Sequence, residues 1–381
     1  MSEVYPTLTA LFTDIADAIR ETTGDTDLII ADDFPDVIRD SLQVKPYLTF
    51  KSPSSFTLNV QDTTKHWDGT LEYSTDTSTW STWDGTTTLS SAISGSNNVL
   101  YLRGTGNTVI TGNNLNYRWV LTGSNIKCIG NIENLLDYAT VQSGNHPTMA
   151  NYCYYNMFQG CTALARAPAL PATTLTNYCY SDMFRNCTSL TQAPALPATT
   201  LAEACYRYMF QGCTALTQAP ALPATTLAGS CYESMFNRCT SLTQAPALPA
   251  TTLANHCYRG MFNRCTSLIK APSELPATTL AENCYRFMFE FTAITSIPRI
   301  MATTYATDSC KGMFDDIKTL NVYSSSGPGH EYGWTAPAST YCSVMFGSDD
   351  GESEWAKLDG SNFPNGGTPT EGVTYYFATV D

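Results

Sequence analysis

Residues 153–178 read CYYNMFQGCTALARAPALPATTLTNY, and residues 179–204 repeat almost the same line as CYSDMFRNCTSLTQAPALPATTLAEA. Further copies begin at Cys205, Cys231 and Cys257, so the period is 26 residues, and one extra residue near Ser273 and Glu274 lengthens the next step to 27. A fixed period in this range is typical of a solenoid, in which each repeat is one supersecondary unit that stacks on its neighbours. We therefore expect the repeats to decide the fold.

The apolar residues of one repeat are spaced as on a helix. Cys179, Met183, Phe184 and Cys187 fall at positions i, i+4, i+5 and i+8, which predicts one buried stripe on a helix over about residues 175–186. A short extended run of alternating apolar and polar residues follows and ends at two prolines. Each unit is thus expected to be a strand, a turn and a helix, and the array an α/β solenoid.

The segment MFRNCTSL, residues 183–190, and its counterparts in the other repeats carry a resemblance. They look like the AF-x-x-C-x-S-L helical segment of the BspA-like branch of the leucine-rich repeats, in which a strand follows the helix. The match covers roughly residues 126–346, with residues 310–314 and 342–346 as decayed last copies. The resemblance implies an α/β leucine-rich-repeat solenoid with units of about 26 residues, and it implies little about function, which varies in this family.

The composition narrows the possible partners. The 381 residues carry a formal charge of −14, which argues against nucleic acid and against an anionic membrane surface, since both need a basic footprint. Charged residues make up only 14 %, and 22 tyrosines contribute to an aromatic fraction of 12 %. Such a polar and aromatic surface is common in adhesins and carbohydrate-contacting proteins. The alternative is that much of the tyrosine is stacked inside the repeats.

The fourteen cysteines are regularly spaced. On the predicted helix the two cysteines of a unit would lie roughly 12 Å apart, too far for a disulfide, and equivalent cysteines of stacked units about a helix diameter apart. We interpret them as buried free thiols that act as small apolar side chains. A zinc site is the alternative, but no C-x-x-C or Cys/His spacing supports it, so no metal or other cofactor is predicted.

Residues 1–45 predict a helical attachment segment. Leu8, Leu11 and Ile15 lie on one helical face, and the start MSEVYPTLTALF lacks the basic region and apolar core of a secretory signal. The string DIADAIRETTGDTDLIIADDFPDVI, residues 14–38, is similar to a short N-terminal module of virion and tail-associated proteins in phages and prophages of gut bacteria. The resemblance implies contact with other virion proteins; the alternative is an ordinary capping helix.

Residues 46–125 change to short alternating runs at intervals near ten residues, which predicts an all-β, Ig-like sandwich that serves as a spacer. We expect Trp119 and Tyr101 in its core, whereas Trp80 and Trp83 are either core or a sugar-stacking platform. Residues 126–322 would then form the solenoid and residues 323–381 a C-terminal cap. In that cap, GVTYYFATV is expected to pair with GHEYGWTAP as a lid.

Positions that differ between repeats cluster after the first cysteine and before the second. On the predicted helices these positions face solvent, and Tyr, Arg and Asn there suit contact with a protein or glycan. The candidate binding surface comprises Tyr155, Asn156, Asp182, Arg185, Arg207, Tyr208, Glu233, Arg238, Arg259, Arg264 and Arg286. The alternative is that these surface positions differ because no function constrains which residues they carry. A regular polar ladder built from the repeated Thr191–Gln192 pair is the competing surface.

The sequence offers little for catalysis. Its four histidines lie far apart, and no nucleophile elbow, phosphate loop or metal signature is present. An EF-hand loop counted from Asp25 would have Ile30 where Gly is needed and Asp36 where Glu is needed. We therefore predict no catalytic residues, no metal ligands and no enzymatic activity.

These observations favour a phage virion structural protein, a tail or head fibre that displays the solenoid for attachment to a bacterial surface protein or glycan. It would be assembled in the host cytoplasm, bind other virion proteins through residues 1–45, and possess no inserted membrane segment; a homotrimer is one possible assembly. The alternative is a BspA-like bacterial surface adhesin that binds host protein or glycan. An enzyme that degrades surface polysaccharide is a third class.

Overall fold

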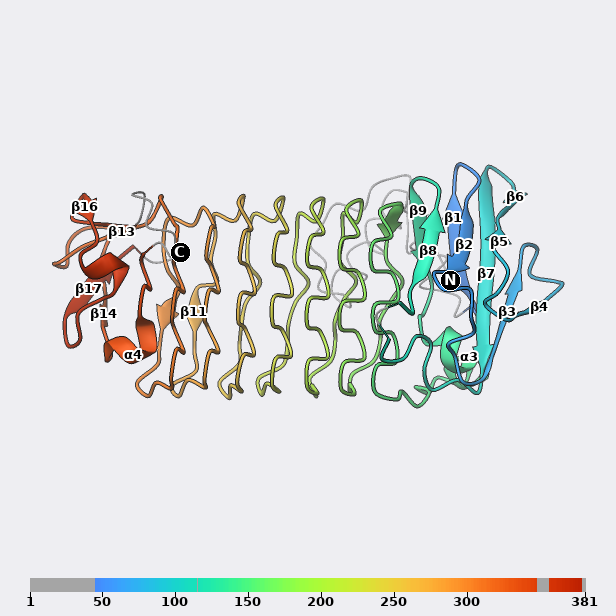
Figure 1. Ribbon diagram of the computed structural model, residues 1–381, viewed down its shortest axis with the longest axis horizontal. Helices are drawn as coiled ribbons and strands as arrows, with labels where there is room; N and C mark the ends of the chain where they lie inside the picture. The colour runs from blue at the N-terminus through green and yellow to red at the C-terminus, as the bar shows by residue number, and fades with distance from the viewer. Residues whose placement is uncertain (1–44, 115, 348–355, 379–381) are drawn as a thin grey trace, which may run out of the picture.

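The computed structural model describes residues 45–114, 116–347 and 356–378, which form an elongated molecule (Figure 1). Two sheets lie at one end, a column of stacked repeats extends from them, and short strands close the other end. We call the part built from residues 153–347 the repeat column. The predicted helical attachment segment lies outside the described residues except for its last residue, Lys45.

The residues before the first repeat, together with one strand of that repeat, form two sheets. Alternating buried and partly exposed residues, as in LTFKS at residues 48–52, give each strand one face for the core. The larger sheet runs β10-β9-β1-β7-β3-β4 with β6 paired to β7, and the smaller runs β5-β2-β8. The bounds are β1 Leu48–Ser52, β2 Thr57–Val60, β3 Thr70–Ser74, β4 Ser81–Trp83, β5 Leu89–Ser90, β6 Ala92–Ser94, β7 Asn97–Thr105, β8 Trp119–Thr122, β9 Ile126–Ile129 and β10 Leu164–Arg166.

The sheets and the repeat column share one core. Phe50 of β1 and Trp119 of β8 come from the two sheets, and both rings pack on Phe158 of the first repeat, with centroids 6.2 and 5.9 Å away. The backbone N–H of Trp119 also donates to the Met157 carbonyl at 2.7 Å. Trp83 is buried as well, whereas Tyr101 and Trp80 are only partly buried. The sheets therefore cover the apolar core of the repeat column at its first repeat.

The predicted α/β solenoid of helix-and-strand units is wrong. The described residues contain two α-helices, α3 (Asn134–Gln142) and α4 (Ser339–Cys342), and neither lies in the near-identical repeats. Neither is long and apolar enough to cross a membrane. Strands in the repeats are equally scarce, and the sheets there are small. For example, β11 (Glu274–Leu275) pairs only with β12 (Arg299–Ile300).

A string of four-residue turns occupies the place of the predicted helix. Every fourth residue has a left-handed backbone, with φ of 58° at Tyr178, 57° at Asp182 and 59° at Asn186. Cys179, Met183, Phe184 and Cys187 are nevertheless fully buried. A burial period of four residues fits both a helix with 3.6 residues per turn and a string of turns that repeats every four. That ambiguity misled the prediction.

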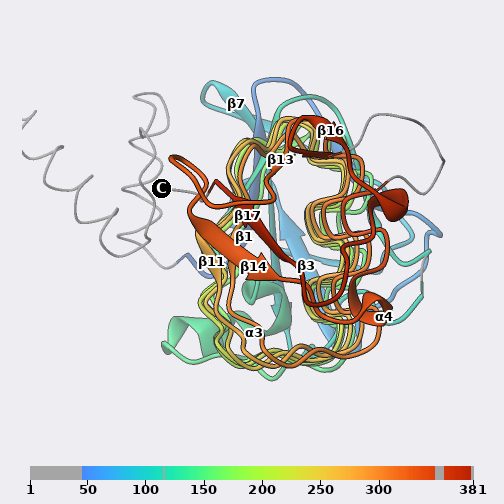
Figure 2. The same ribbon diagram turned by 90° about the vertical axis from the view of Figure 1, so that its left-hand side faces the viewer.

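Along the turn string, successive backbone N–H groups donate in turn to a carbonyl of the same repeat and to a carbonyl of the next repeat. The Met183 N–H donates to the Tyr180 carbonyl at 3.3 Å, closing a turn, while the Tyr180 N–H donates to the Cys205 carbonyl of the next repeat at 3.0 Å. The same alternation continues through the other repeats. As Figure 2 shows along the column axis, successive repeats therefore superpose.

The predicted strand after the turn string forms in the first repeat, as β10, and is reduced to single bridges in the repeats that follow. Gln192 bridges Gln218, and Thr174 bridges Thr200, in parallel register. Pro194 and its equivalents have no N–H to donate, so a continuous ladder cannot form along this wall.

Stacking places identical side chains on top of one another in the core. The rings of Phe184, Phe210 and Phe236 lie 5.7 Å apart with nearly parallel planes, and a second ladder runs through the buried tyrosines from Tyr154 to Tyr285. All fourteen cysteines are buried free thiols, as predicted, although the helical distances behind that prediction do not apply to turn strings. The Cys213 Sγ donates to the Phe184 carbonyl at 3.1 Å, and burial raises its pKa to about 12.

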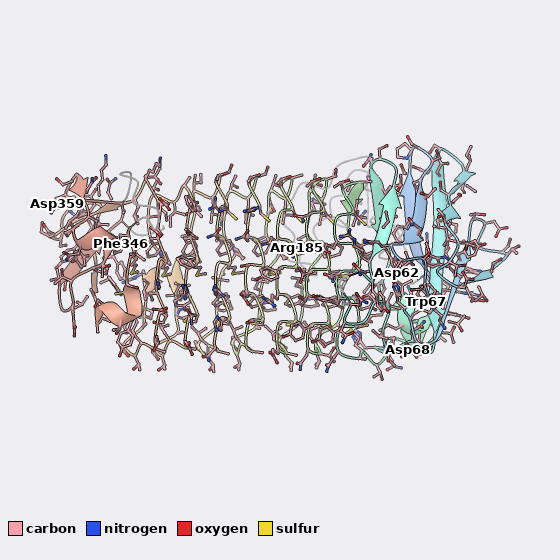
Figure 3. The ribbon with its side chains drawn as sticks, in the orientation of Figure 1. Asp62, Trp67, Asp68, Arg185, Phe346 and Asp359 are labelled. Carbon is pink, nitrogen blue, oxygen red and sulfur yellow. The ribbon has the colours of Figure 1, made fainter. Side chains whose placement is uncertain are left out.

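The C-terminal residues close the far end of the column. Phe346 lies at this end of the molecule (Figure 3). Its ring packs on Phe363 and Phe377, with centroids 4.9 and 5.8 Å away. β14 (Tyr332–Thr335) pairs antiparallel with β17 (Thr374–Phe377), which confirms the predicted pairing of these two segments. The remaining elements are β13 Asn321–Val322, β15 Lys357–Leu358, β16 Ser361–Asn362 and the 3₁₀-helix η1 Asn365–Gly367.

We predict that Phe210→Ala lowers the free energy of unfolding by about 3–5 kcal/mol, because it leaves a cavity and interrupts the ring ladder on both sides. Chemical denaturation of the full chain measures this loss. Thr217→Ala, at an exposed position of the same repeat, is the control and is expected to stay within about 0.5 kcal/mol. A loss below about 1 kcal/mol for Phe210→Ala would contradict the stacked core.

Candidate functional site

The eleven predicted surface residues all lie on the turn strings. We define the variable face as the positions two, three, six and seven residues after the first cysteine of each repeat. Arg238 and Arg264 are exposed there, whereas Asn156, Asp182 and Glu233 are buried. The other predicted residues, which are half-buried, are Tyr155, Arg185, Arg207, Tyr208, Arg259 and Arg286.

The backbone explains part of this arrangement. Positions three and seven of the variable face take the left-handed conformation, with φ of 58° at Asn156, 62° at Arg238 and 60° at Arg264. Asn and Asp tolerate this conformation better than other non-glycine residues. Positions two and six lie between the left-handed residues. Asn156 and Asp182 thus serve the backbone as well as the surface.

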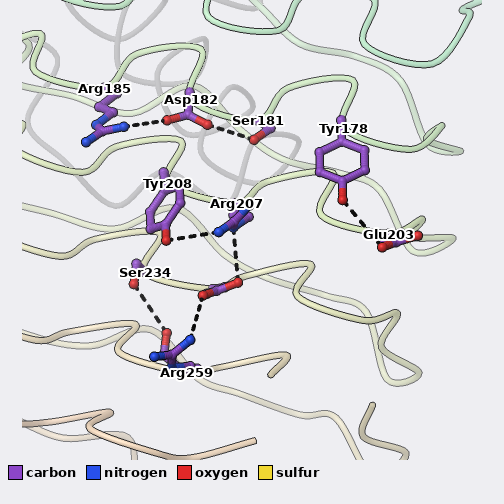
Figure 4. Close-up of polar contacts among 10 residues, drawn as sticks. Tyr178, Ser181, Asp182, Arg185, Glu203, Arg207, Tyr208, Ser234 and Arg259 are labelled. Atoms are coloured by element: carbon purple, nitrogen blue, oxygen red, sulfur yellow. Dashed lines mark hydrogen bonds and ion pairs between the residues drawn. The ribbon is translucent and has the colours of Figure 1, made fainter. Parts of the chain in front are cut away.

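Ion pairs connect successive repeats along the variable face (Figure 4). The Glu233 carboxylate, which is 7 % exposed, lies between two guanidinium groups: Arg207 Nε at 3.0 Å and Arg259 Nη1 at 3.4 Å. These arginines occupy the same position in the repeats before and after it. Arg185 pairs with Asp182 within one repeat at 3.1 Å. The predicted solvent-facing residues therefore neutralise one another in part.

Aromatic rings lie beneath several of the arginines. The Arg207 guanidinium lies 4.5 Å from the Tyr208 ring and donates to its hydroxyl at 3.1 Å. Arg264 lies 4.2 Å from the Phe291 ring, and Arg286 lies 4.9 Å from a second phenylalanine, Phe287. Flat cations over flat rings hold both groups in defined orientations.

A row of amides follows position six. Gln211 donates to Asn237 at 3.3 Å, and Asn237 donates to Asn263 at 3.1 Å. The row ends at Glu290, which accepts from Asn263. Side-chain amides in such a row retain donors and acceptors for a ligand with hydroxyl groups.

An acidic cluster ends the variable face. Carboxylate oxygens of Glu290, Asp315 and Asp316 lie within 4.8 Å of one another, and Asp315 is buried. Oxygen ligands at this spacing suit a divalent cation. In the part of the chain that the structure describes, this is the one group with such geometry. The cluster was not predicted from the sequence, although Glu290 and Asp316 each lie six residues after the first cysteine of their repeat, Cys284 and Cys310.

Two histidine–carboxylate pairs also escaped the sequence analysis. His66 Nε2 lies 2.6 Å from Asp62 and stacks on Tyr117, and burial lowers the pKa of His66. His146 Nδ1 lies 2.8 Å from Glu133, whose carboxylate is fully buried and has its pKa raised by burial. The i, i+4 spacing of Asp62 and His66 was the available signal. Both pairs lie outside the repeats.

The opposite wall of the column has a different character. Thr191, Gln192 and their equivalents in the next two repeats are exposed and uncharged. Two hollows, of about 100 and 430 Å³, lie toward the sheets. The first, beside Arg118 and Trp119, touches the start of the variable face at Gln159 and Gly160. The second lies beside Phe56, between the strands of the smaller sheet.

Comparison of the chain with models of known protein families, with curated proteins and with solved structures found no match. The candidate site therefore depends on the geometry described above.

We predict that Asp182→Asn reduces the pH dependence of stability without lowering stability at pH 7.5. Burial raises the pKa of Asp182, although Ser181 and Arg185 offset part of this rise, so the folded state binds more protons than the unfolded state in mildly acidic solution. Stability therefore falls as the pH rises through the raised pKa. Asparagine removes this titration, suits the left-handed backbone, and occupies the equivalent position as Asn156.

Chemical denaturation at pH 4, near the ordinary pKa of an aspartate, and at pH 7.5 measures the effect. The wild-type chain should lose more stability between the two values than the variant does. An unchanged pH dependence in the variant would exclude a contribution from Asp182, and the remaining dependence should come from groups such as Glu133.

Proposed function

We propose that the protein is a structural component of a phage virion, a tail or head fibre, that displays the repeat column for attachment to a bacterial cell surface. In this proposal the column binds and does not catalyse. Residues 14–38, outside the described part of the chain, support the virion assignment only through their similarity to virion-associated modules.

The observation that carries the binding role is the contrast between two exposed surfaces of the same repeats. On the wall, Thr191, Thr217 and Thr243 of three consecutive repeats are identical, and so are the glutamines that follow them; the repeats before and after these three carry Ala165–Arg166 and Ile269–Lys270 there. On the variable face of the same three repeats, the positions six and seven residues after the first cysteine are Arg185–Asn186, Gln211–Gly212 and Asn237–Arg238. Repeats that carry the same residues on one surface and different residues on another are expected where the second surface recognises a ligand.

The shape of the column also favours recognition of a large ligand. Its variable face is continuous from Tyr155 to Arg286, because backbone hydrogen bonds hold each repeat against the next. An extended ridge suits a polymer or a protein surface, whereas small molecules are bound in concave pockets.

The alternative is the bacterial surface adhesin implied by the BspA-like resemblance of the repeats. It shares the binding face and differs in what residues 1–45 do. A test of the function must therefore assign both ends of the chain.

We predict that the labelled full chain binds intact bacterial cells and also sediments with virions that lack this protein. A chain that begins at residue 45 should bind cells equally well and fail to join virions. The column should not be cut from the sheets for this test, because Phe50 and Trp119 would lose their contact with Phe158. Cell binding without virion binding would favour the adhesin, and the absence of both would refute the proposal.

A further inference from the structure

Positive charge gathers on one face of an acidic protein. The chain as a whole carries a formal charge of −14 and only 20 Lys and Arg residues. Six of these arginines occupy the variable face in five consecutive repeats: Arg185, Arg207, Arg238, Arg259, Arg264 and Arg286. Only some of them are balanced by Asp182, Glu233 and Asp308 through the ion pairs. The face is therefore distinct in charge from the rest of the molecule.

Of these six arginines, Arg238 and Arg264 are the two that form no ion pair with a carboxylate among the described residues. They occupy the same position of adjacent repeats, and the Arg238 N–H donates to the Asn263 carbonyl at 2.9 Å, so their backbones are about one strand spacing, ~4.8 Å, apart. Both are exposed, and neither forms an ion pair with an acidic residue of the described chain. Side chains from positions this close can reach one common anionic group, and each guanidinium is a strong donor to a carboxylate or phosphate.

The groups around this arginine pair suit a sugar polymer. The Arg264 guanidinium lies over the Phe291 ring, which holds it in place, and Asn237 and Asn263 carry amides in the adjacent row. Guanidinium groups bind carboxylate or phosphate in a bidentate manner, and amides bind hydroxyl groups. The repeat spacing is comparable to the length of one sugar residue in an extended chain.

We propose that the variable face binds an acidic polysaccharide extended along the column, with Arg238 and Arg264 contacting its carboxylate or phosphate groups. This inference rests on the proposed function and specifies its ligand. Nucleic acid fits less well, because the chain as a whole carries a formal charge of −14 and the acidic cluster of Glu290, Asp315 and Asp316 lies at the end of the face.

The left-handed backbone provides a clean test variant. Arg238→Asn combined with Arg264→Asn removes both charges, and asparagine tolerates φ values of 62° and 60°, so the fold should be kept. The matched control removes two charges from the wall by Arg166→Gln and Lys270→Gln, since glutamine occupies the equivalent position as Gln192. Denaturation of both variants checks that they remain folded.

The experiment measures binding of the full chain to immobilised alginate, a carboxylate polymer, to a teichoic acid that carries phosphate, and to neutral dextran. We expect the wild type and the wall control to bind at least one acidic polymer and not dextran, and to bind it more weakly as salt increases. The double asparagine variant should bind about tenfold more weakly or worse. Comparison of alginate with teichoic acid identifies the acidic group.

Equal binding by the double asparagine variant and the wild type would overturn the proposal, as would binding to dextran or single-stranded DNA in preference to both acidic polymers. A parallel assay with whole bacterial cells separates the two levels of inference. Cells bound without acidic polymers would refute the ligand class and leave the attachment role standing, whereas the absence of cell binding would refute the attachment role itself.

Discussion

The structure depends on the alternation of backbone hydrogen bonds in the turn strings. Within the segment from Tyr178 to Cys187, every second N–H closes a turn of its own repeat and the others donate to the following repeat. The first set fixes the local path, and the second sets the distance between repeats. Because both sets involve the same short segment, each side chain is forced to lie over its equivalent. The phenylalanine and tyrosine ladders and the buried cysteines follow from that constraint.

The same constraint produces the variable face. Side chains that differ between repeats are held at one fixed spacing, so that Glu233 lies between Arg207 and Arg259, and Arg238 lies beside Arg264. Pairing or repulsion along the face is therefore decided by which residues neighbouring repeats carry. A substitution in one repeat alters the electrostatics of the next without disturbing the core. Such a face can diversify while the fold is kept.

Part of this fold could be predicted from the sequence. The period and the burial of Cys179, Met183, Phe184 and Cys187 follow from spacing alone, whereas the free thiols were predicted from helical distances that the structure does not have. The helix does not follow from spacing, because a burial period of four residues is shared by helices and turn strings. The residues that could have distinguished them are Asn156, Gly160, Asp182 and Asn186, which take the left-handed backbone four residues apart in the first two repeats; later repeats have Tyr208, Ser234 and Arg238 at equivalent positions and lose the signal. For the site, the common face could be predicted, whereas burial of Asp182 and Glu233 depends on contacts between repeats.

Far-UV circular dichroism of a chain that begins at residue 45 tests the central claim, that stacked turn strings and not helices build the repeats. Residues 1–44 then make no contribution to the spectrum. The turn strings predict a spectrum without the paired negative bands of an α-helix. A spectrum in which those bands correspond to a helix in every repeat would contradict the account.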